Sequence, residues 1–169
     1  MRLRPIVALA TLLLTLSGPM AHTQEPSRRP LASTHLDQLA ELLKLEETRT
    51  FDEPALGRLL GSTHPEVRRR AALTVGRVVD HRGRTLLSRL RADGDVDVVA
   101  MVAFSSGQLK DPDAVPWLAE TLSAQTADPD VAREAARSLG KIRTAEARAG
   151  LAHYLATAPA TPAASRDAR

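Results

Sequence analysis

HPEVRRRAALTVGRVVD, at residues 64–80, decides the fold of this chain because its pattern returns twice without gaps. The second copy is DVDVVAMVAFSSGQLKD at residues 95–111, and the third is DPDVAREAARSLGKIRT at residues 128–144. The copies start 31 and 33 residues apart. A fixed period of roughly 20 to 50 residues is typical of solenoid proteins, so the sequence predicts a repeat array.

Each copy has the spacing of one amphipathic helix. In the first copy, the apolar side chains of Val67, Ala71, Val75 and Val78 recur every three or four residues and form one stripe. Pro65 at the first helical position lacks the N–H that a helix start leaves unsatisfied. The pattern therefore predicts a helix of about four turns in each copy, with its stripe turned toward a core.

One glycine recurs at the same place in every copy, as Gly76, Gly107 and Gly140. Each of them follows an alanine four residues earlier and on the same side of the helix. Because small residues let two helices approach closely, we expect all three glycines at contacts between successive repeats.

Shorter helices are expected between the copies, at residues 54–60, 83–90, 113–122 and 145–155, with an extra leading helix at residues 34–48. Aromatic residues make up only 2% of the 169 positions, and sandwich and barrel folds depend on them. The predicted fold class is all-α, an α-α superhelix of about three helix pairs plus flanking helices. Because the chain has no cysteine, it cannot hold a disulfide, a thiolate metal site or a cysteine nucleophile.

The first 23 residues have the order of a secretory signal. Arg2 and Arg4 precede an uncharged apolar run at residues 6–16, and Ser17-Gly18-Pro19 then breaks the helix. The run is shorter than the roughly 20 residues that span a bilayer. We therefore expect an exported protein, with an uncleaved anchor or a buried N-terminal helix as alternatives. The remaining parts would be a linker at 24–33, the solenoid at 34–157, and an Ala/Pro-rich tail or the start of a further repeat at 158–169.

Charge is arranged in blocks along the chain. Residues 66–91 carry a net +6, residues 92–134 a net −7 and residues 135–169 a net +4. Without Arg2 and Arg4 the net charge is +1, so overall charge gives no strong attraction to polyanions. Two interpretations stay open for the blocks: solvated faces with ion pairs between repeats, or a polarised binding surface. Nucleic acid is not expected as a partner, because stacking aromatics are lacking.

No pattern of catalytic, cofactor-binding or metal-ligating residues stands out. The five histidines are dispersed without a helical pair. Asp93, Asp95 and Asp97 begin like a calcium loop, but the glycine and the twelfth-position glutamate of such a loop are replaced by Val98 and Phe104. We expect this acidic cluster to sit at a helix N-terminus, where the helix dipole favours it. Ser106 interrupts the apolar stripe, and its hydroxyl is expected to bond to the carbonyl four residues earlier.

The strings LKDPDAVPWLAETL (109–122) and DPDVAREAARSLGKI (128–142) resemble HEAT repeats of the short bacterial type found in phycobilin-lyase-like proteins. The resemblance covers roughly residues 50–156. It implies an α-superhelix whose second helices line a concave face, and a protein-binding scaffold. Residues 48–80 also resemble, more weakly, the N-terminal region of exported bacterial HEAT proteins, some of which continue into a cyclophilin-type prolyl isomerase.

In the geometry that the resemblance implies, the side of each second helix opposite its stripe faces the concave surface. Two interpretations of Phe104 stay open: it lies at the apolar centre of a binding surface with Leu73 and Met101, or it turns into the core beside Ser106. Basic rims would favour a peptide with apolar residues between acidic ones. The candidate protein-binding residues are Arg69, Arg70, Leu73, Arg77, Met101, Phe104, Gln108, Arg133, Arg137 and Lys141.

The sequence thus predicts an exported, non-catalytic scaffold that binds a protein or peptide and needs no cofactor. Two alternatives are kept: the N-terminal HEAT region of a longer exported enzyme, such as a peptidylprolyl isomerase, and a polyanion-binding module. Self-association is also expected, through the apolar side of Leu151 and Leu155 at the C-terminal edge.

Overall fold

The computed structural model describes residues 35–124 and 128–157, which belong to the compact unit Ser33–Arg169. These residues form α-helices and one 3₁₀ turn, with no strand among them. The predicted signal, linker and tail lie outside the described residues. The elements are α1 (His35–Thr48), α2 (Glu53–Leu60), α3 (Pro65–Val78), α4 (Gly83–Ser88), α5 (Val96–Gln108), η1 (Pro112–Ala114), α6 (Val115–Ser123), α7 (Pro129–Ile142) and α8 (Ala145–Thr157).

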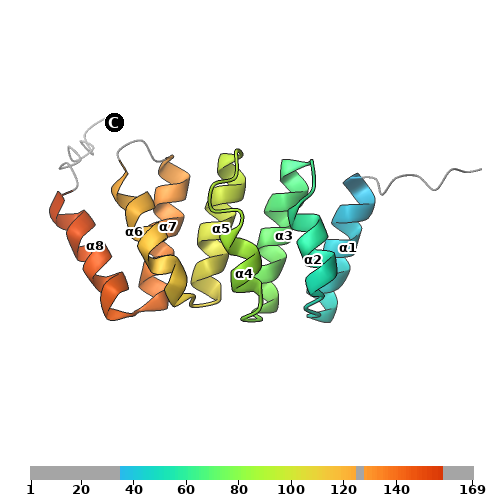
Figure 1. Cartoon of the computed structure of the whole chain (residues 1–169), viewed down its shortest axis with the longest axis horizontal. Helices are drawn as coiled ribbons and strands as arrows, with labels where there is room; N and C mark the ends of the chain where they lie inside the picture. The colour runs from blue at the N-terminus through green and yellow to red at the C-terminus, as the bar shows by residue number, and fades with distance from the viewer. Residues whose placement is uncertain (1–34, 125–127, 158–169) are drawn as a thin grey trace, which may run out of the picture. The chain divides into compact units, whose positions relative to one another are not determined.

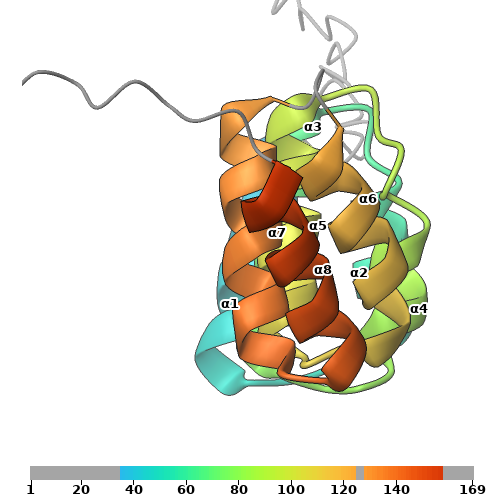
Figure 2. The same cartoon turned by 90° about the vertical axis from the view of Figure 1, so that its left-hand side faces the viewer.

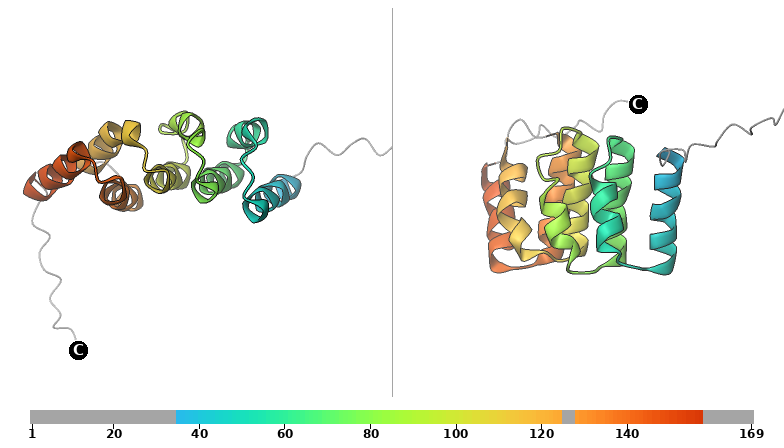
Figure 3. Two further views of the ribbon diagram at one scale, coloured as in Figure 1. Left: turned by 90° about the horizontal axis from the view of Figure 1, so that it is seen from below. Right: turned by 45° about the vertical axis from the view of Figure 1, so that its right-hand side comes forward.

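The helices stack in two layers, which confirms the predicted all-α solenoid. Figure 1 shows them side by side, and the left-hand view of Figure 3 shows α1, α3, α5 and α7 in one layer with α2, α4, α6 and α8 in the other. Helices α3, α5 and α7 pack on one another in order, and α1 packs on α3. The three gapless copies of the sequence pattern are therefore three successive helices of this layer, α3, α5 and α7, and the leading helix α1 extends it.

Local sequence fixes where the helices begin. Asp52, Asp95 and Asp128 stand at the N-caps of α2, α5 and α7, and each side chain accepts a hydrogen bond from a backbone N–H of the first turn. Pro65 and Pro129 occupy the first position of α3 and α7. The acidic cluster around Asp95 is thus a helix start, as expected.

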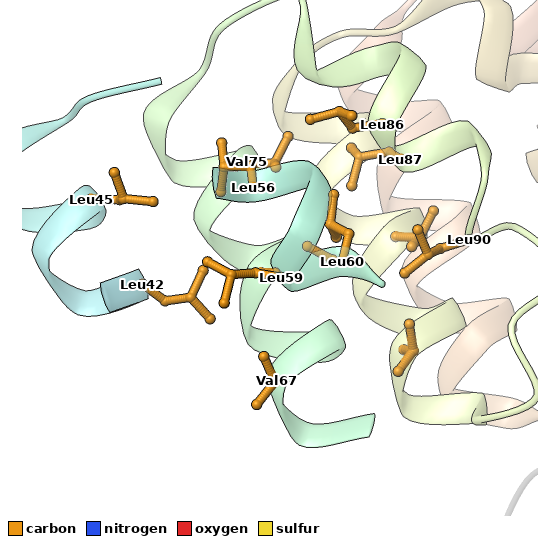
Figure 4. Packing of buried hydrophobic residues seen from close by; sticks show 14 of the residues in the cluster. Leu42, Leu45, Leu56, Leu59, Leu60, Val67, Val75, Leu86, Leu87 and Leu90 are labelled. Carbon is orange, nitrogen blue, oxygen red and sulfur yellow. The ribbon is translucent and has the colours of Figure 1, made fainter. Parts of the chain in front are cut away.

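The buried stripes of the two layers meet in a core made almost only of Leu, Val and Ala. Figure 4 shows Leu42, Leu59 and Val67 at the end of this core that α1, α2 and α3 enclose. A second cluster around Leu118 and Leu139 continues between α6, α7 and α8. Close packing of small aliphatic side chains is what lets a chain with so few aromatics bury a continuous interior.

Two serine–glycine contacts join the second helices. The Ser105 hydroxyl of α5 donates a hydrogen bond to the Ala72 carbonyl of α3 at 2.8 Å. A Cβ atom placed on Gly76 would lie only 2.6 Å from the Ser105 hydroxyl oxygen. Ser138 of α7 makes the same contact with α5. Its hydroxyl donates to the Ala103 carbonyl at 2.7 Å, and its side chain packs against Gly107. The expectation that Gly76 and Gly107 lie at contacts between repeats is confirmed.

Gly140 is the exception, and its expected contact is wrong. It is exposed, and a Cβ added to it would meet no atom within 4 Å among the described residues. The physical reason is its place in the array: no further second helix packs on this side of α7 in the part of the chain that the structure describes. At the same C-terminal edge, Leu155 is 76% exposed and Leu151 is partly buried.

Ser106 also departs from its expectation. Its side chain is fully buried in the stripe of α5, yet its hydroxyl has no hydrogen-bond partner among the described residues. The expected bond to the carbonyl four residues earlier is therefore absent. The inter-repeat bond belongs to the neighbouring Ser105 instead.

The glycines provide a matched pair of substitutions. We expect Gly107→Ala to destabilise the fold, because its Cβ would lie 2.4 Å from the Ser138 hydroxyl oxygen. Gly140→Ala should raise the free energy of unfolding by up to about 1 kcal/mol, since alanine is the better helix former and nothing obstructs it. Thermal and urea unfolding measure both changes. Equal effects of the two substitutions would contradict this interface.

An ion pair between Arg68 and Asp93 adds a second tie between repeats. Two guanidinium nitrogens of Arg68 donate to the two Asp93 carboxylate oxygens at 2.8 Å, and a third donates to the Ser62 carbonyl at 2.9 Å. Both side chains are mostly buried. The hydrogen bonds from Arg68 hold the pKa of Asp93 below its usual value.

A carboxylate with a lowered pKa stabilises the fold above its unfolded pKa of about 4 and loses this contribution as the pH falls through the folded pKa. We expect Asp93→Asn to cost about 1–3 kcal/mol at pH 7 and less below pH ~4. Urea unfolding at a series of pH values tests this. Asp113→Asn, on an exposed carboxylate, is the control, and a parallel pH profile in both variants would refute the role of Asp93.

Candidate functional site: a groove over α3, α5 and α7

A groove of about 260 Å³ crosses the surface of α3, α5 and α7. Figure 2 looks along the array and shows α5 behind α7 in the same layer. Leu73, Met101 and Phe104, which the sequence predicts at the centre of a binding surface, line the groove together. The complete lining is Arg69, Leu73, Asp97, Ala100, Met101, Phe104, Asp130, Arg133 and Glu134.

Phe104 lies at the groove with one ring face covered. It is partly buried, and the Lys141 ammonium stands 4.6 Å from the centre of its ring. Lys141 also donates to the Gln108 side-chain oxygen at 3.2 Å, which joins α7 to the C-terminal end of α5. The Ser105 side chain points at α3. Successive residues are rotated by about 100° around the helix axis, so the neighbouring Phe104 points toward the groove.

The helix position of each lining residue follows from the repeat. Arg69, Ala100 and Arg133 are equivalent in the three copies, and Leu73 is equivalent to Phe104. Four lining residues were not among the predicted ones: Asp97, Ala100, Asp130 and Glu134. The repeat contains a signal for the two aspartates, because each lies one turn before Met101 or Glu134 on the same side of its helix.

Arg70 and Arg77 lie away from the groove and are paired with α1. Glu46 accepts hydrogen bonds from Arg70 at 2.9 Å and from Arg77 at 2.6 Å, and its side chain is only 11% exposed. Its other oxygen accepts from the Thr74 hydroxyl at 2.8 Å. These two arginines therefore join α1 to α3 instead of forming the basic rim that the sequence predicts.

The two arginines of α7 are paired within their own helix. Arg133 bonds to Asp130, and Arg137 lies 2.8 Å from Glu134. Arg69 lines the groove and makes no ion pair among the described residues. The groove thus has an apolar floor and a rim whose charges are mostly neutralised, which can bind an apolar side chain but offers little to a polyanion.

Two further properties concern the described residues as a whole. No group of three His, Cys, Asp or Glu side chains in residues 35–124 and 128–157 is placed to hold a metal ion. No helix of these ranges is long and apolar enough to cross a membrane.

Residues 83–166 match the sequence model of the HEAT repeats family. A search of curated proteins finds no relative. The match begins at the first residue of α4 and takes in α4 to α8. Together with the paired helices, it identifies residues 83–166 as HEAT repeats within a chain whose described part is an α-α solenoid.

Proposed function

We propose that this protein is an exported, non-catalytic scaffold that holds a partner protein in the groove over α3, α5 and α7. The observation that carries the proposal is the meeting of Leu73, Met101 and Phe104 from two repeats in one groove. HEAT repeats suggest a protein-interaction scaffold in general. An exposed apolar patch with a polar rim is the kind of surface that marks such a site.

The chemistry of the groove favours a partner segment with a bulky apolar side chain. Phe104 and Met101 offer a polarisable, aromatic contact, and the paired acids and arginines at the rim leave little net charge. Apart from Arg69, the arginines expected to attract acidic residues each pair with a carboxylate of this chain. Apolar contact, more than charge, would therefore select the partner.

Phe104→Ala tests the groove. Because Phe104 is partly buried at the surface, we expect it to cost about 1 kcal/mol of stability, against about 2–5 kcal/mol for Leu118→Ala in the core. A photo-crosslinking residue at Ala100, in the groove, should yield a discrete adduct with an envelope extract that Phe104→Ala removes. The same residue at exposed Thr85 on α4 should yield none.

A loss of several kcal/mol in Phe104→Ala would place the ring in the core and end the groove proposal. So would an adduct at Ala100 that survives the substitution at full strength.

Export rests on the order of basic, apolar and helix-breaking residues in the first 23 positions. We expect the mature chain to begin between Ala21 and Gln24. Intact-mass spectrometry of the protein from an envelope fraction checks this. An uncut chain beginning at Met1 and found in the cytosol would be the contrary result.

A further inference from the structure

A second groove lies beside α5 and shares no lining residue with the first. It has a volume of about 440 Å³ and opens between the N-terminal ends of α5 and α7 and the side of α6. Figure 1 shows these three helices next to one another in the array. The lining residues used below are Asp93, Val96, Trp117, Glu120 and Asp128.

The floor of this groove is apolar. Val96 is 45% exposed at the start of α5, and the Trp117 indole of α6 is partly buried beside it. Arg91 lies over the indole at 5.4 Å, and it shares the buried Asp111 carboxylate, 3.5 Å away, with Arg84. An aromatic ring and an exposed valine together offer a place for one bulky apolar side chain.

The rim of the groove is acidic, and no lysine or arginine lines it. Glu120 is exposed and makes no ion pair among the described residues. Asp128 caps α7 by accepting from the Asp130 N–H at 2.8 Å, which leaves its charge uncompensated by a cation. The charge of Asp93 is compensated by its ion pair with Arg68. The groove therefore presents two unbalanced carboxylates around an apolar floor, unlike the neutralised rim of the first groove.

We propose that this second groove binds a peptide segment in which lysine or arginine residues flank one bulky apolar residue. The apolar side chain would lie against Val96 and Trp117, and the cations would meet Glu120 and Asp128. Charge complementarity decides the choice of partner, because an acidic segment would face two carboxylates with no cation to offset them. The attraction acts between exposed groups, so binding weakens as ionic strength rises.

Trp117 is the only tryptophan of the chain, so its fluorescence reports on this groove alone. The full chain is titrated with the blocked peptide Lys-Lys-Leu-Lys-Lys at low and at physiological salt. We expect a saturable change in the Trp117 emission that is weaker at the higher salt. Glu-Glu-Leu-Glu-Glu tests the charge and Lys-Lys-Ser-Lys-Lys tests the apolar residue, and both should bind at least several times more weakly.

The double variant Glu120→Gln and Asp128→Asn removes the two charges while asparagine keeps the helix cap. We expect it to weaken the basic peptide about fivefold with an unchanged melting temperature. The matched control, Glu47→Gln with Asp113→Asn, removes two exposed carboxylates outside the groove and should leave the affinity as it is. Phe104→Ala should also leave it unchanged, which separates this proposal from the first groove.

Any of the following peptide-binding results would overturn the proposal: no saturable change in emission up to millimolar peptide, equal binding of the acidic peptide, or full affinity in the double variant. A Trp117 signal that changes with the concentration of the protein alone, together with a dimer mass in ultracentrifugation, would assign the groove to a second copy and would likewise reject the basic peptide.

Discussion

The contact between a serine hydroxyl and a backbone carbonyl across a glycine sets the spacing of this array. Ser105 and Ser138 reach the carbonyls of Ala72 and Ala103 only because Gly76 and Gly107 have no side chain in between. The distance between successive second helices is therefore fixed by backbone, which does not adjust as a long side chain would. Phe104, next to Ser105, owes its position over the groove to this fixed spacing.

At the α1 end, the same position of the repeat binds a different acceptor. Thr74 stands where the later copies have serine, and its hydroxyl donates to Glu46 instead of a carbonyl. Glu46 also accepts hydrogen bonds from Arg70 and Arg77, so one carboxylate contacts a hydroxyl and two guanidinium groups at this interface. Such a polar junction suits the end of an array, where the helix must face both a neighbour and water.

The sequence predicted the repeat, the helix starts and the glycine contacts, because each depends on residues close together in the chain or on the period. The helix ends carry no such signal. Each of the helices α1, α3, α5 and α7 is followed by a residue with the positive φ of the left-handed backbone conformation, yet none of these residues is glycine. These residues are Arg49, Val79, Lys110 and Arg143. The ion pairs were equally hidden, since Arg70 and Glu46 are 24 positions apart and only packing brings them together. Gly140 was misplaced because the period assigns it a neighbour that the described chain does not supply.

The distribution of charge divides the two grooves between two kinds of recognition. Five arginines pair with carboxylates of neighbouring elements: Arg68 with Asp93, Arg70 and Arg77 with Glu46, and Arg84 and Arg91 with Asp111. Acidic residues that start helices, such as Asp128, are held by backbone N–H groups, which orient them without cancelling their charge. The helices α1, α3, α5 and α7 start at one edge of the array, and the helices between them start at the other. Both grooves include residues from the starts of α5 and α7. The first groove has arginines beside its aspartates and depends on its apolar floor, whereas no lysine or arginine of the described residues lines the second, so the acidic residues there attract cations.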